Sequence, residues 1–237
     1  CLCLILFGCS ARKDEVFSFV VVPDTQTLMK SKSEKLKTLT EWIMNNRETY
    51  NIKFVLHVGD MFDNGSNLVE QNKYARKCFD NIISSDLPIM FAMGNHDYDN
   101  NINSNRNSST FNSLFKVSDF EDRDWFIGTF EEGKIENSYS ILQIGKQKYL
   151  IICLEFGPRD AVIDWAEDII VANPDCKVII NTHSYLYIDG THTKPGDKHN
   201  PVSYGGAKDG NDGQSLFERL IKKHKNIYAV FSGHHIL

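Results

Sequence analysis

The sequence predicts an α/β fold with a parallel sheet, and two observations carry that prediction. Apolar runs of strand length alternate along the chain with stretches that repeat apolar residues at helical spacing, which is the pattern of βαβ units. The apolar runs also stop at polar residues, as strands do where a parallel sheet opens into a site beyond its carboxyl edge. The chain has 237 residues, 41% of them hydrophobic and 24% charged, which is typical of a globular protein with a sizeable core.

The first half of the chain is expected to form three parallel strands joined by two helices. The strands are predicted at residues 16–22, 52–58 and 88–93, and the helices at 33–46 and 68–83. Both helical stretches carry an apolar stripe, so one face of each helix would pack against the sheet. An Asn-rich stretch, 99–109, is expected to be an exposed loop, with a helical segment after it at 110–115.

The second half changes from parallel to antiparallel pairing, which suggests a second sheet. Two apolar runs, 139–144 and 148–154, flank the turn Gly145-Lys146-Gln147 and are expected to form a hairpin. Beyond it the sequence predicts a helix over 161–171, a strand over 177–181, a helix bearing Leu216 to Ile221 and capped by Asn211 or Asp212, and a strand over 227–231. The stretch 188–213 shows no periodicity, and so long an irregular loop is expected to be functional.

Residues 1–9 are expected to be part of a signal peptide. Residues 1–7 are wholly apolar, and the run is too short to span a bilayer. Leu6-Phe7-Gly8-Cys9 resembles a bacterial lipobox, which makes Cys9 the expected lipidation site and implies membrane attachment through acyl chains. The location that follows is the cell envelope, at its periplasmic or outer-membrane face. An ordinary cleaved signal or a buried first strand are the alternatives.

The net charge argues against nucleic-acid binding, and the cysteine spacing argues against a fold held by disulfides or zinc. The formal net charge is −5, so no electrostatic surface for nucleic acid is evident. Cys78, Cys153 and Cys176 are widely spaced, which favours buried free thiols over a disulfide framework or a zinc knuckle. The sequence does not indicate an oligomeric state.

Five apolar strands end in a residue that can bind a metal. These residues are Asp24, Asp60, Asn95, His183 and His234. Any one of them alone would more often be a turn residue or a satisfied histidine. If the five strands were parallel in one sheet, however, all five side chains would reach the same edge, and together they point to a metal site.

The five positions resemble the motifs of the calcineurin-like metallophosphoesterase family. Gly59-Asp60-Met61-Phe62-Asp63 and Gly94-Asn95-His96-Asp97 match its second and third motifs, and His183 and Gly233-His234 follow in the family's order. The resemblance implies a four-layer αββα sandwich as the catalytic domain over 16–237. Because such sandwiches usually continue with further strands, the chain is expected to be truncated at its C-terminus.

The resemblance also implies roles for individual residues. Asp60 would bridge two divalent metal ions, with Asn95, His183 and His234 completing one site and Asp24 serving the other. Two ions held in this way would stabilise the attacking and leaving oxygens and would supply a hydroxide nucleophile for attack on the phosphorus. His96 would be the catalytic residue that stabilises the phosphoryl charge or protonates the leaving oxygen, and Asp97 would orient its ring.

Two departures from the family motifs fall on the same metal site. The first motif reads Pro23-Asp24-Thr25-Gln26, with Gln26 in the place of a histidine, and the last motif has Ile236 in the place of its second histidine. The chain thus resembles a branch of the family with a Pro-Asp-Thr-Gln motif. Gln26 can ligate through its carbonyl oxygen, which favours Mn²⁺, Fe²⁺ or Mg²⁺ over Zn²⁺. The Asp24–Gln26 site is expected to be the weaker of the two.

Two functions remain open on this reading. The first is a metal-dependent phosphoesterase that hydrolyses phosphate mono- or diesters, and the second is a lipid-anchored binding protein on a degenerate scaffold. Arg159 could bind a phosphate oxygen, or equally form a structural ion pair, and Tyr185 and Tyr187 could line the cleft. The loop 188–213 is expected to decide the substrate, whereas His57 is expected to be packed rather than ligating.

Overall fold

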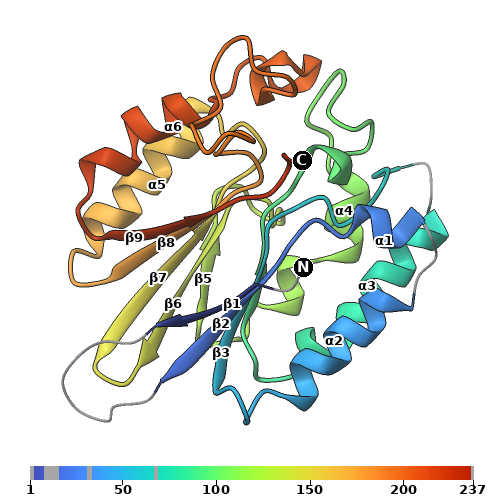
Figure 1. Cartoon of the computed structure of the whole chain (residues 1–237), viewed down its shortest axis with the longest axis vertical. Helices are drawn as coiled ribbons and strands as arrows, with labels where there is room; N and C mark the ends of the chain where they lie inside the picture. Colours follow the sequence, from blue (N-terminus) through green and yellow to red (C-terminus); the bar gives the residue numbers. More distant parts are fainter. Residues whose placement is uncertain (1–2, 8–15, 31–33, 67–68, 236–237) are drawn as a thin grey trace.

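The computed structural model describes residues 3–7, 16–30, 34–66 and 69–235. Two β-sheets lie face to face at the centre, with helices on the outer face of each (Figure 1). The layers therefore run helices, sheet, sheet, helices. This arrangement confirms the predicted four-layer α/β sandwich.

The first sheet contains four strands in the order β1-β2-β3-β4. Strands β2 (Phe17–Val22), β3 (Ile52–His57) and β4 (Ile89–Phe91) are parallel, and β1 (Cys3–Phe7) pairs antiparallel with β2. The helices of this half are α1 (Gln26–Lys30), α2 (Lys35–Asn45), α3 (Val69–Ile83) and α4 (Ser109–Leu114). Helix α1 was not among the expected elements, and β1 falls on the segment for which a first strand was the alternative.

The second sheet contains five strands in the order β5-β6-β7-β8-β9. Its strands are β5 (Phe126–Thr129), β6 (Ser138–Ile144), β7 (Gln147–Cys153), β8 (Lys177–Asn181) and β9 (Ile227–Phe231). Pairing is antiparallel from β5 to β7 and parallel from β7 to β9. The predicted hairpin and second sheet are thereby confirmed, and β5 lies in a stretch for which no strand was expected.

Two helices cover the outer face of the second sheet. They are α5 (Asp160–Ala172) and α6 (Gly213–Arg219), and Asp212 caps α6 by accepting the Ser215 N–H at 2.9 Å. Short 3-10 turns complete the structure at Asn95–Asp97, Val117–Asp119, Pro201–Ser203, Gly205–Ala207 and Ile221–Lys223. Two of these turns interrupt the loop 188–213, which is otherwise irregular as predicted.

Strand alternation divides the core into three parts. In β2, Phe19 and Val21 face the second sheet, whereas Val20 and Val22 face the helices. In β7, Ile151 faces the first sheet and its neighbours face α5. Because successive strand side chains point to opposite faces, continuous apolar runs can fill the layer between the sheets and an outer layer at once.

The N-terminal prediction is only partly covered by the described residues. Cys9, the expected lipidation site, lies outside them, so lipidation stays a prediction. Residues 3–7 pair with β2, which is the arrangement of the alternative in which this segment is a first strand. No helix within the described ranges combines the length and the apolar character needed to cross a bilayer.

Candidate metal centre

The predicted ligands come from both sheets rather than from one. Asp24, Asp60 and Asn95 follow β2, β3 and β4 of the first sheet, while His183 and His234 follow β8 and β9 of the second. The single-sheet arrangement considered for the five strands is therefore not the observed one. The ligands meet because the parallel strands of both sheets end at the same end of the sandwich (Figure 1).

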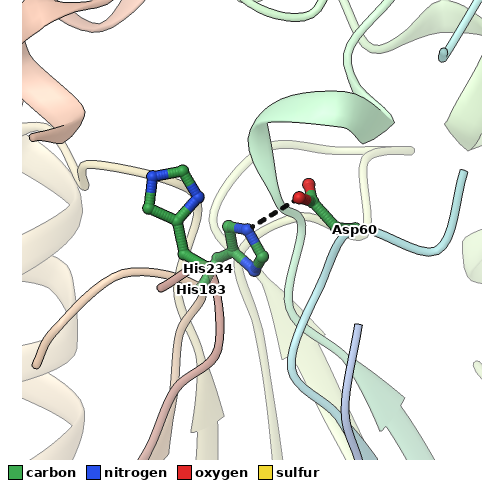
Figure 2. Close-up of side chains that lie close together, drawn as sticks. All are labelled: Asp60, His183 and His234. Atoms are coloured by element: carbon green, nitrogen blue, oxygen red, sulfur yellow. Dashed lines mark ion pairs between the residues drawn. The ribbon is translucent and has the colours of Figure 1, made fainter. Parts of the chain in front are cut away.

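Asp60, His183 and His234 form the centre of the site. One ligand atom from each lies within 4.8 Å of the others, and Asp60 Oδ2 is 3.2 Å from His183 Nε2. In Figure 2 the His183 ring lies between the carboxylate and the His234 ring. Carboxylate and imidazole groups in this arrangement are suitable ligands for a divalent transition metal.

The electrostatics of this centre are dominated by the buried pair. Burial alone would raise the pKa of Asp60, but His183 outweighs it and lowers that pKa to about 2. Burial lowers the pKa of His183, and the carboxylates of Asp60 and Asp24 outweigh it and raise the pKa to about 10. Without a metal ion, a proton on His183 therefore supplies the positive charge that Asp60 requires.

The backbone around Asp60 is shaped to present its carboxylate. Asp60 has a φ of 52°, in the left-handed region, and its carbonyl oxygen accepts the N–H groups of Thr25 and Gln26 at 3.0 and 2.9 Å. Gly94 lies so close that a Cβ there would stand 2.1 Å from Asp60 Oδ1. The loop after β4 can thus place the His96 N–H 2.9 Å from Oδ1.

Buried polar atoms of two predicted ligands lack a hydrogen-bond partner among the described residues. They are Oδ1 of Asp24 and Oδ1 of Asn95, and both residues lie at the predicted centre. An unpaired buried polar atom is costly, and a bound cation would satisfy these atoms. The donor set of Asp60, Asn95, His183 and His234 therefore fits a divalent ion.

The second predicted site, at Asp24 and Gln26, offers fewer ligand atoms that face a common point. Asp24 Oδ2 accepts the backbone N–H of His234 at 3.1 Å, and Gln26 directs its amide nitrogen to Asp60 Oδ2 at 3.1 Å. Gln26 therefore presents a donor to the carboxylate that would bridge two ions, instead of adding an oxygen ligand there. Burial raises the pKa of Asp24, as expected for a carboxylate without a firm cationic partner.

Asp97 does not orient the His96 ring, which corrects the role predicted for it. Its two carboxylate oxygens accept the backbone N–H groups of Phe62 and Gly94, at 3.0 and 2.9 Å. Burial and the nearby Asp60 raise the pKa of Asp97 to about 7. The His96 ring is instead held through Nδ1, 2.6 Å from the carbonyl oxygen of Asp63. Asp97 thus ties together the loops that carry Asp60 and Asn95.

A pocket of about 430 Å³ opens over the centre. Gln26, Asp60, Asn95 and His96 line it from the first sheet, and His234 and His235 from the second. The remaining wall comes from the long loop region, through Tyr187, Ile188, Lys198, His199 and Tyr204. The loop 188–213 therefore forms part of the pocket wall, and its role in substrate choice stays a prediction.

Two residues predicted to bind substrate lie elsewhere. Arg159 forms ion pairs with Glu155 and Glu131, both at 2.8 Å, so the structural alternative for this residue is the observed one. Tyr185 is buried in the core of the second sheet, with its ring 4.9 Å from that of His192. Neither residue lines the pocket.

Lys198 and Tyr204 are two pocket residues that the sequence did not indicate. Both lie in the irregular loop, where no periodicity indicates which side chains point inward. Their one sequence signal is membership of a long loop that precedes a metal-ligand motif.

His57 is packed, as predicted. Its Nδ1 accepts the Gly59 N–H at 3.1 Å, so its Nε2 carries the proton and donates to Thr25 Oγ1 at 3.1 Å. Thr25 Oγ1 in turn donates to the Met61 carbonyl at 3.3 Å. Burial lowers the pKa of His57 to about 3, so the ring stays neutral and ties the Asp24 loop to the Asp60 loop.

The molecule is a two-sheet sandwich that gathers carboxylate, amide and imidazole side chains beyond the ends of its parallel strands. The chain belongs to the calcineurin-like phosphoesterase family, whose sequence model matches residues 17–236. It is also similar to an uncharacterized protein, YvnB of Bacillus subtilis (strain 168), with 25% identity over 221 residues. The match covers 93% of this chain but spans only 15% of the length of that relative.

Proposed function

We propose that this chain is a metal-dependent phosphoesterase that hydrolyses phosphate mono- or diesters. The observation that carries the proposal is the pair of unpartnered buried oxygens on Asp24 and Asn95, beside the cluster of Asp60, His183 and His234. Membership of the calcineurin-like phosphoesterase family supports it. The proposal concerns this domain, and the activity of any longer protein that contains it is a separate question.

The firmer metal site in this proposal consists of Asp60, Asn95, His183 and His234. A second, weaker site consists of Asp24 and Gln26, which need the Gln26 amide to turn its oxygen inward. Divalent ions bound at the two sites would supply Lewis-acid stabilisation of the phosphoryl oxygens and a nucleophile at neutral pH. Mn²⁺, Fe²⁺ and Mg²⁺ suit the oxygen-rich second site better than Zn²⁺.

His96 is the residue proposed to handle the proton of the leaving group. Its Nδ1 lies on the Asp63 carbonyl and so carries a hydrogen, because a carbonyl oxygen only accepts. Any proton that His96 delivers to substrate must therefore leave from Nε2. His96 lines the pocket together with Asp60 and Asn95, which supports a role for its ring at the leaving oxygen.

The test is hydrolysis of aryl phosphate mono- and diesters by the purified chain after metal removal and readdition of Mn²⁺. We expect activity that depends on the metal, is abolished in Asp60→Ala and falls by about 10²–10⁴ in His96→Ala. Lys146→Ala, on the exposed hairpin turn, is the matched control and should keep full activity. No hydrolysis with any divalent metal would reject the proposal.

The binding-protein alternative draws on one observation, the Gln26 amide that donates to Asp60 Oδ2. Elemental analysis separates the two functions. About two metal ions per chain favour the enzyme, whereas one or none, together with no turnover, favours a binding protein on a degenerate scaffold.

Membrane attachment through Cys9 is a further part of the proposal and draws on the lipobox-like sequence alone. Metabolic labelling with a radioactive fatty acid tests it, with Cys9→Ser as the control. Labelling that Cys9→Ser abolishes supports a lipid-anchored protein of the cell envelope. An unlabelled protein that keeps residues 1–8 argues for the first-strand alternative.

A further inference from the structure

The ring of His234 is held by a residue outside the predicted ligand set. Its Nε2 lies 2.9 Å from the carbonyl oxygen of His199. Because a carbonyl oxygen can only accept, Nε2 carries the hydrogen and Nδ1 of the neutral ring has a free lone pair. In Figure 2 one ring nitrogen of His234 faces His183 and Asp60 while the other points away.

The His183 ring is also held by a backbone carbonyl, but through its other ring nitrogen, Nδ1. Its Nδ1 donates to the carbonyl oxygen of Val58 at 2.8 Å, which leaves Nε2 facing Asp60. Each histidine thus has one nitrogen on a backbone carbonyl and the other directed at the cluster, which is the arrangement that fixes ligand histidines in metal sites. The two carbonyls differ in origin, because Val58 follows strand β3 and His199 belongs to the loop 188–213.

The backbone conformation at His199 fixes the place of its carbonyl oxygen. His199 has a φ of 61°, a left-handed conformation that non-glycine residues adopt rarely and that concentrates at functional sites. The next residue, Asn200, is buried and donates to Asp212 Oδ2 at 3.3 Å, and Asp212 caps α6. The carbonyl of His199 is therefore anchored to the second sheet's helical layer.

Aromatic packing also links the loop 188–213 to the ring of His234. Tyr204, from the same loop, packs its ring edge-on against Phe156 at 5.2 Å. The Phe156 ring in turn lies 5.1 Å from the His234 ring. His234 is thus enclosed between Phe156 and the loop that lines the pocket.

We propose that His199 is a positioning residue of the metal site, whose carbonyl oxygen holds Nε2 of His234 and so directs Nδ1 at the ion. This inference rests on the proposed function, because it assumes that His234 binds a metal. Its consequence is that the substrate-facing loop 188–213 also sets the geometry of one ligand. Metal affinity should then depend on the backbone conformation at His199 and not on its imidazole.

Three substitutions separate the backbone from the side chain. His199→Gly and His199→Asn tolerate a positive φ and keep the carbonyl in place, whereas the β-branched side chain of His199→Val disfavours that conformation. We expect Mn²⁺ affinity, measured by calorimetry on the metal-free chain, to stay within about threefold in the first two. In His199→Val it should fall about 10–100-fold.

Each other outcome has a defined meaning. Unchanged affinity in His199→Val, or an equal loss in all three variants, overturns the role of the carbonyl while the proposed function stands. A wild-type chain that binds no Mn²⁺ overturns the proposed function and this inference with it. Should His199→Val fail to fold, ¹⁵N NMR of the metal-free wild type decides the matter, because an Nδ1-protonated His234 overturns the inference and an Nε2-protonated ring supports it.

Discussion

The charge state of His183 determines how the centre accepts a metal ion. Its folded-state pKa is raised to about 10, because Asp60 and Asp24 outweigh the effect of burial, so the ring is protonated at neutral pH in the metal-free chain. A ligating imidazole must be neutral. The metal and the proton therefore compete for the same nitrogen, Nε2.

This competition predicts a strong pH dependence of metal binding. We expect about one proton to be released per Mn²⁺ bound at pH 7, and the affinity to rise by about tenfold per pH unit up to about pH 10. Calorimetry in buffers of different ionisation enthalpy measures the released proton directly. A heat of binding that does not depend on the buffer would contradict this assignment.

The raised pKa of His183 also predicts how the free energy of unfolding of the metal-free chain changes with pH. Because the folded-state pKa of His183 lies above its ordinary value of 6.5, the pair with Asp60 stabilises fully below pH 6.5. That contribution is lost as the pH rises towards 10. Urea unfolding without metal should therefore show a falling midpoint over this range.

A single methyl group at Gly94 is expected to disturb the centre. Gly94 has an ordinary φ of −91°, so alanine is not strained there, but its Cβ would lie 2.1 Å from Asp60 Oδ1. Gly94→Ala should therefore displace the carboxylate and weaken Mn²⁺ binding by more than about tenfold, or about 1.4 kcal/mol. Gly128→Ala is the matched control, because its Cβ would meet its nearest neighbour, Tyr139, at an ordinary 3.4 Å. Equal Mn²⁺ affinity in the two variants would refute the steric argument.

At the scale of elements, the turn after β2 is fastened to the turn after β3 by Thr25. The hydroxyl accepts from His57 and donates to the Met61 carbonyl, and both Thr25 and His57 are fully buried. The two turns carry Asp24 and Asp60. Thr25 therefore sets the spacing between the halves of the predicted dinuclear site without being a ligand.

Thr25→Val tests this fastening because it keeps the side-chain shape and removes the hydroxyl. It leaves the His57 N–H unpaired in the core, so we expect a loss of about 1–3 kcal/mol in the free energy of unfolding. Thr25→Ser keeps the hydroxyl and should lose clearly less. Chemical denaturation of the metal-free variants provides the comparison, and equal losses in both would mean that the methyl group matters rather than the hydrogen bonds.

At the scale of the whole molecule, the centre joins the two sheets where their parallel strands end. Asp60 and Asn95 follow strands of the first sheet, and His183 and His234 follow strands of the second. An ion bound to all four would cross-link the sandwich at that end. Binding to the folded state alone then stabilises the fold by mass action.

The expected effect on thermal stability is measurable. At a free Mn²⁺ concentration of about 100 times its Kd, the gain is about 2.7 kcal/mol, which corresponds to about 5–10 °C in Tm for a chain of this size. Scanning calorimetry with Mn²⁺ and with a chelator measures it, and Asp60→Asn should show no such shift. An unchanged wild-type Tm would mean that no ion binds the folded chain at that concentration.

The elements of the fold were largely predictable because their signals are local. Helices α2, α3 and α5 and the strands from β2 to β9, apart from β5, follow from runs of apolar residues and their spacing. Strand β5 was missed because Phe126–Thr129 is short and includes a glycine, so its β-structure depends on pairing with β6. Helix α1 is five residues long, too short to show a periodicity.

The candidate site was likewise predictable only in part. The sequence alone indicated which residues have ligand chemistry, since Asp60, Asn95, His183 and His234 each follow a strand. Tertiary structure decided that these ligands come from two sheets, that Asp97 holds backbone N–H groups while Asp63 orients His96, and that Arg159 is bound by Glu155 and Glu131. The physical reason is that strand ends are set by short-range periodicity, whereas the partner of a polar side chain depends on which distant segments packing brings within 3 Å of it.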